Sequence, residues 1–67
     1  MSLNRHIWEG WRVRDFIEHL EFSFRYEADK LQNESDVKKW CKNNQPYYKK
    51  SIPEVNQYFI NIWRDQN

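Results

Sequence analysis

Few side chains in this sequence are suited to catalysis, and they lie far apart. The two histidines, His6 and His19, are thirteen residues apart, and Cys41 is the single cysteine. Nucleophilic catalysis needs a nucleophile beside a base, and a metal site needs several ligands at short spacing. Asp15 and His19 are one helical turn apart, but such pairs are common on helix surfaces and contribute little to helix stability. We therefore predict no enzyme activity, no bound metal and no cofactor.

The single cysteine also bears on stability and on the cellular compartment. An intrachain disulfide needs two cysteines, so the class of small secreted domains held by disulfides is excluded and a reducing cytoplasm is expected. Cys41 follows Trp40 on an apolar stripe, where a thiol behaves as a small buried hydrophobe. The alternative is a reactive thiol, because Lys38 and Lys42 would lower its pKa if it were exposed. Thiol labelling of the native protein distinguishes the two.

Lysines are concentrated in the middle of the chain. Residues 1–36 carry five basic and eight acidic groups, whereas residues 37–53 carry five lysines and no acid. The candidate partner or nucleic-acid surface consists of Lys38, Lys39, Lys42, Tyr47, Tyr48, Lys49 and Lys50. Lysines bind phosphates and tyrosines stack on bases, but the segment has no arginine, which reads guanine best. Three interpretations stay open: a solvated face favoured by the helix dipole, a nucleic-acid contact, and an acidic protein partner.

A second group of residues lies opposite the main apolar stripe of the first expected helix. By helical spacing, this candidate self-association face consists of Trp11, Phe22 and Tyr26. Either the N-terminal segment with Ile7 and Trp8, or another helix, covers these residues within the same domain, or they form a homodimer or partner surface. The acidic residues Asp15, Glu18 and Asp29 share this side. An acidic, aromatic face on one molecule can therefore meet the lysines of another, in an association that salt weakens.

A long helix is expected to carry that face. Apolar residues recur at three- and four-residue steps over 12–31, at Val13, Phe16, Ile17, Leu20, Phe24, Ala28 and Leu31. Twenty residues make a rod about 30 Å long. No capping side chain occupies positions 9–12, so the first turn depends on Gly10 or on tertiary contacts. The arm at 1–10 is expected to be extended or to form one helical turn.

The rest of the chain predicts two shorter helices. Asn33, Ser35 and Asp36 can each cap a helix over 35–44, whose apolar stripe is Val37, Trp40 and Cys41. Pro46 ends that helix and opens a short turn over 46–50, and Pro53 begins a last helix over 53–65. The sequence predicts one all-α domain over 1–67, a small three-helix bundle with a long first helix and a proline-bounded turn before the last. No apolar stretch is long enough to cross a membrane.

Two segments of the chain resemble a known group of proteins. Residues 39–55 read KWCKNNQPYYKKSIPEV, and this segment resembles one shared by a family of small bacterial proteins of unknown function, some carried on mobile elements. Ile7–Trp11 and Val13–Ile17 are similar to the N-terminal part of those proteins, which have threonine in place of Arg12. The resemblance covers most of the chain, but it implies no activity, ligand or catalytic residue. A mobile-element setting modestly favours a nucleic-acid or host-protein contact.

The function that we predict is a non-enzymatic interaction module. It presents the lysine-rich segment to a protein partner or to a second copy of itself. The alternative is an accessory nucleic-acid-binding protein that uses the same lysines, with Tyr47 and Tyr48 as stacking groups.

Overall fold

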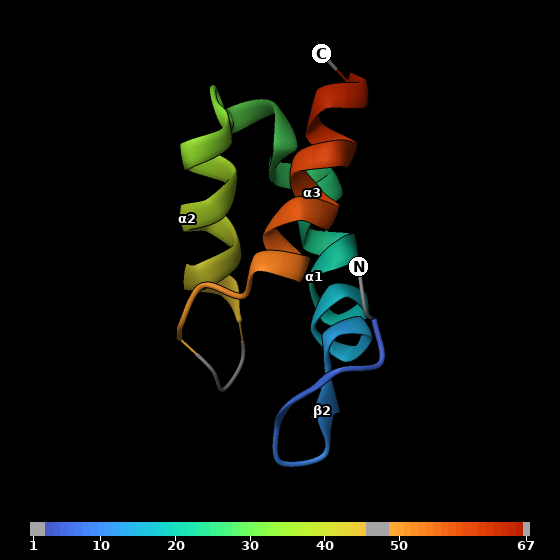
Figure 1. Cartoon of the computed structure of the whole chain (residues 1–67). Coiled ribbons are helices and arrows are strands. Elements are labelled where there is room, and N and C mark those ends of the chain that lie inside the picture. The colour runs from blue at the N-terminus through green and yellow to red at the C-terminus, as the bar shows by residue number, and fades with distance from the viewer. Residues whose placement is uncertain (1–2, 46–48, 67) are drawn as a thin grey trace.

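Helices make up most of the residues that the computed structural model describes, which are 3–45 and 49–66. In chain order the elements are β1 (His6–Trp8), β2 (Trp11–Arg12), α1 (Val13–Glu27), the 3-10 turn η1 (Ala28–Lys30), α2 (Glu34–Asn44) and α3 (Pro53–Gln66) (Figure 1). The mostly helical class agrees with the prediction, although the small sheet was not expected. Within these residues, no helix combines the length and apolar character that a membrane span requires.

The N-terminal arm forms a small hairpin. β1 and β2 pair antiparallel, with His6 opposite Arg12 and an irregularity between His6 and Trp8. The connecting turn contains Gly10, whose φ of 70° is in the left-handed region that L side chains rarely adopt. Of the two arm conformations that the sequence left open, the extended one is therefore present.

The same arm supplies the missing cap of α1. The Val13 N–H donates to the Arg5 carbonyl at 3.0 Å, and the Arg14 N–H donates to the Leu3 carbonyl at 2.9 Å. The first N–H groups of a helix have no partner within the helix, so these backbone bonds satisfy two of them. The first turn is thus held without a capping side chain from positions 9–12.

The first helix is shorter than the 12–31 rod that the sequence predicts. α1 ends at Glu27, η1 follows, and Leu31 is extended with its N–H bonded to the Ala28 carbonyl at 3.1 Å. Ala28 is buried and Leu31 packs against the core, so both residues fit the apolar pattern without continuing the α-helix. Spacing alone could not show this change, because a tighter turn also keeps residues three apart on one side.

The start of α2 explains why α1 must stop. The Asn33 side chain accepts from the Asp36 N–H at 2.9 Å, and the Asp36 carboxylate accepts from the Gln32 N–H at 3.1 Å. Both bonds require an extended backbone at Asn33 rather than a helical one. Of the three residues able to cap this helix, Asn33 therefore occupies the cap position, and α2 begins one residue before the predicted start.

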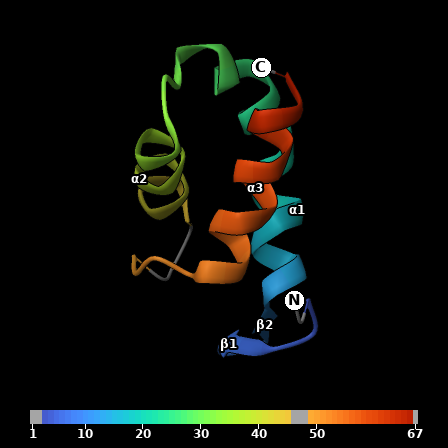
Figure 2. The same cartoon turned by 45° about the horizontal axis from the view of Figure 1, so that its top comes forward.

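The three helices share one core, and α3 lies against both of the others. Figures 1 and 2 show α2 and α1 placed around α3 in both views. At the centre, the Phe24 and Phe59 rings are 4.8 Å apart, and Trp40 lies 5.1 Å from Phe24 and 5.9 Å from Phe59. The buried hydrophobic residues are Val13, Phe16, Ile17, Leu20, Phe24, Ala28, Val37, Trp40, Cys41, Ile52, Val55, Phe59 and Ile60.

Candidate interaction surfaces

The outer face of α1, opposite its buried stripe, carries an exposed aromatic pair. Phe22 is 69% exposed and Tyr26 is 73% exposed. The two residues are one helical turn apart, and their ring centroids are separated by 5.2 Å at an interplanar angle of 59°. They therefore shield one another only in part, and together they offer a continuous apolar area. We call Asp15, Glu18, His19, Phe22 and Tyr26 the α1 outer face.

Trp11 does not join this pair, contrary to the prediction from helical spacing. It belongs to β2, before the helix begins. Its ring lies 5.0 Å from Phe16 and meets the His19 ring edge-on at 6.1 Å. The side chain is consequently half-buried over the first turns of α1. The structure brings together two of the three predicted residues and places the third at the N-terminal end of the same face.

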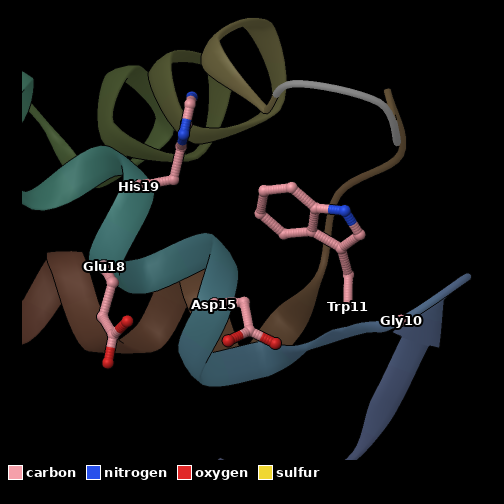
Figure 3. A pocket seen from close by; sticks show the side chains of 5 residues that line it. All are labelled: Gly10, Trp11, Asp15, Glu18 and His19. Atoms are coloured by element: carbon pink, nitrogen blue, oxygen red, sulfur yellow. The ribbon is translucent and has the colours of Figure 1, made fainter.

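A shallow, open depression of about 500 Å³ lies beside Trp11. Its lining comes from the hairpin turn and from α1: Gly10, Trp11, Asp15, Glu18 and His19. Figure 3 shows the Trp11 and His19 rings toward one side of it and the Asp15 and Glu18 carboxylates toward the other. An indole ring beside carboxylates attracts ammonium groups.

Sequence reasoning placed Asp15 and Glu18 on this side of the helix but did not identify the depression. Asp15 also accepts from the Arg12 N–H at 2.6 Å, which fixes the start of the helix next to it. The spacing of the two carboxylates, three residues apart, was the available signal. Their position beside Trp11 depends on the hairpin, which was not predicted from the sequence.

The lysines of α2 are exposed, as a solvated or binding face requires. Lys38, Lys39 and Lys42 lie on the side of the helix away from the buried residues Val37 and Cys41. Lys49 and Lys50 are exposed as well. We call these five residues the lysine surface: Lys38, Lys39, Lys42, Lys49 and Lys50. Tyr47 and Tyr48, and with them most of the predicted turn over 46–50, lie outside the described residues.

Two buried amide side chains hold the segment that follows the lysines. Gln45 is 3% exposed, and its Nε2 donates to the Lys50 carbonyl at 2.9 Å. Asn56 is also buried, and its Nδ2 donates to the Ser51 hydroxyl, while its own backbone N–H donates to the Ile52 carbonyl at 2.9 Å. The backbone of Lys50 is therefore fixed close to the end of α2. This arrangement places Lys50 near the C-terminal end of α2, the end that also carries Lys42. The only signal in the sequence was the polar residues next to the prolines.

Cys41 and His6 both have structural positions in the fold. Cys41 is fully buried, and burial raises the pKa of its thiol to about 12. Arg12 Nε donates to His6 Nε2 at 2.7 Å, so His6 is held in the hairpin. Across residues 3–45 and 49–66, no three histidine, cysteine or carboxylate side chains are grouped so as to bind a metal ion.

Comparison with known proteins gives this chain no relative. No protein-family model matches it, and no curated protein or solved structure is significantly similar to it. The interpretation of the two surfaces consequently rests on their geometry and charge.

Proposed function

We propose that this chain is a non-enzymatic interaction module, a small three-helix bundle that acts in a reducing cytoplasm and binds a protein partner or another copy of itself. The observation that carries the proposal is the exposed Phe22–Tyr26 pair. Two adjacent aromatic rings left in water contribute little to the stability of the monomer, whereas aromatic residues dominate the binding energy of protein interfaces. The resemblance to small bacterial proteins remains a prediction.

The experiment is a pull-down with the tagged chain from a bacterial lysate, with and without nuclease. A protein partner is retained after nuclease digestion and is lost when Phe22→Ser and Tyr26→Ser are combined. The matched control combines Gln57→Ser and Asn61→Ser, which change exposed polar residues on α3 and leave binding intact. Retention of the same partner by the aromatic variant would contradict the proposal.

The second candidate function is nucleic-acid binding, and the observation that favours it is the lysine surface itself. Its five exposed lysines come from a segment that contains no acidic residue. Lysines neutralise phosphates one by one, so such binding falls steeply with salt. A gel-shift titration tests this candidate. The absence of any shift even at roughly 50 mM salt, where the electrostatic attraction is strong, would exclude it.

A further inference from the structure

The α1 outer face and the lysine surface carry opposite features on one molecule. The α1 outer face combines the exposed pair Phe22 and Tyr26 with the carboxylates of Asp15 and Glu18. Its basic neighbours on the helix, Arg14 and Arg25, lie along one edge by helical spacing. The lysine surface has five ammonium groups, and the segment over 37–53 that contains them has no acidic residue. The part of the α1 outer face that borders the depression, with Asp15 and Glu18, is therefore complementary in charge to the lysine surface.

These surfaces cannot meet within one molecule. The buried residues of α1 and α2 belong to the core that both helices share with α3, and their exposed sides therefore face away from it. Figure 2 shows α1 and α2 at different places around α3. Gln45 and Asn56 in addition fix residues 50–52 beside the ends of α2 and α3. A contact between an α1 outer face and a lysine surface thus requires two molecules.

The depression beside Trp11 is the place where a lysine of one molecule can bind the other. A lysine side chain that enters it brings its ammonium between the Asp15 and Glu18 carboxylates and the indole ring. Both kinds of group stabilise a cation, and the long aliphatic stem of lysine covers apolar surface on the way. Phe22 and Tyr26 lie further along the same helix, and helix α2 of the second molecule then covers them.

We infer that the α1 outer face binds the lysine surface of a second copy of this chain, so that copies associate head to tail. This inference rests on the proposed function and names its partner. Because the two surfaces in contact are different, each bound pair keeps one free surface of each kind. Such heterologous contacts close into rings or extend into chains rather than stopping at a symmetric dimer.

Sedimentation velocity of the full chain tests the inference. At roughly 50 mM salt, the weight-average mass is expected to rise with protein concentration above the 8.5 kDa of the monomer. At roughly 1 M salt the Debye length falls to about 3 Å, and the mass is expected to return toward that of the monomer. A monomer at every concentration in low salt, or association that is unaffected by salt, would overturn the inference.

Two variants distinguish a head-to-tail contact from a symmetric one. The aromatic variant combines Phe22→Ser with Tyr26→Ser, and the lysine variant combines Lys38→Glu, Lys39→Glu and Lys42→Glu. Each is expected to be monomeric alone, because each has lost one of the two surfaces. An equimolar mixture is expected to form a species of two chains and nothing larger, since each variant keeps the surface that the other lacks.

Other outcomes of the mixing experiment contradict the inference. A lysine variant that associates alone as the native chain does would show a contact between two aromatic faces. A mixture that stays monomeric, with both variants folded by circular dichroism, would likewise overturn it. Should the glutamate substitutions unfold α2, Lys38→Gln, Lys39→Gln and Lys42→Gln remove the charges without adding new ones. If the native chain stays monomeric yet captures a partner after nuclease treatment, the inference fails while the proposed function stands.

Discussion

Burial determines what the single thiol of this chain can do. Lys38 and Lys42 precede and follow Cys41 in the sequence, and an exposed thiol between them would be expected to ionise readily. The structure places the thiol in the core instead, whereas both lysines are exposed. Loss of hydration outweighs the backbone hydrogen bond that lowers the pKa of this thiol, and the pKa of Cys41 rises to about 12.

We predict that Cys41 of the native chain reacts slowly with a thiol-specific disulfide reagent at pH 8. The thiolate is the reactive form, and the buried side chain becomes accessible only when the structure opens. Labelling followed by absorbance is expected to be at least about 100-fold slower than in denaturant, because each opening costs several kcal/mol of free energy. Labelling at the denatured rate would show that the thiol is exposed and would reopen the reactive interpretation.

The elements show which features of the fold can be predicted from sequence and which cannot. The apolar spacing located the three helices, because each buries one stripe and spacing reports burial. It placed the end of the first helix too late, since Ala28 and Leu31 are covered in a 3-10 turn and an extended residue. It also placed Trp11 with Phe22 and Tyr26, although helical angles do not apply to a residue that lies in a strand. Lys38, Lys39 and Lys42 needed only an exposed helix face, and they are exposed.

The cap of α2 gives a direct test at this scale. Asn33 is the one of three candidate residues whose side chain accepts the Asp36 N–H, whereas Ser35 is exposed within the first turn. We predict that Asn33→Ala lowers the free energy of unfolding by about 1 kcal/mol, the usual contribution of a cap. The matched control Ser35→Ala should change it by less than about 0.5 kcal/mol. Urea unfolding monitored by tryptophan fluorescence measures both, and equal effects would contradict the assignment of the cap.

At the scale of the whole molecule, polar side chains connect elements that are distant in sequence. Arg5 pairs with Glu54, which joins the hairpin to α3, and Arg64 pairs with Glu34, which joins α3 to α2. The Trp63 indole donates to the Leu31 carbonyl at 3.0 Å, across the link between α1 and α2. No spacing rule predicts such pairs, because each depends on how the helices are placed relative to one another. A chain of 67 residues can form only a small hydrophobic core, and these polar contacts add to the stability that the core provides.

Because of the hydrogen bond between Tyr58 and Glu21, the stability of the folded chain is expected to fall at alkaline pH. Tyr58 Oη donates to Glu21 Oε1 at 2.7 Å, joining α3 to α1. This bond raises the pKa of Tyr58 above its ordinary value of 10.0, and burial raises it further. The folded chain thus holds the phenol proton more firmly than the unfolded chain does. The resulting stabilisation is fully present below pH 10 and is lost as the pH rises through the folded pKa.

We therefore predict a pH-dependent effect of Tyr58→Phe. At pH 7 this variant should lose about 1 kcal/mol of unfolding free energy, because it lacks the hydrogen bond. The difference from the native chain should narrow as the pH is raised above the ordinary pKa of 10.0, since the native chain loses the same bond on ionisation. Urea unfolding of both proteins at each pH measures this difference, in which the titration of the lysines cancels. Tyr26→Phe, at an exposed position, should change stability by less than about 0.5 kcal/mol at pH 7. A Tyr58→Phe difference that is constant with pH would show that the phenol proton does not connect α3 to α1.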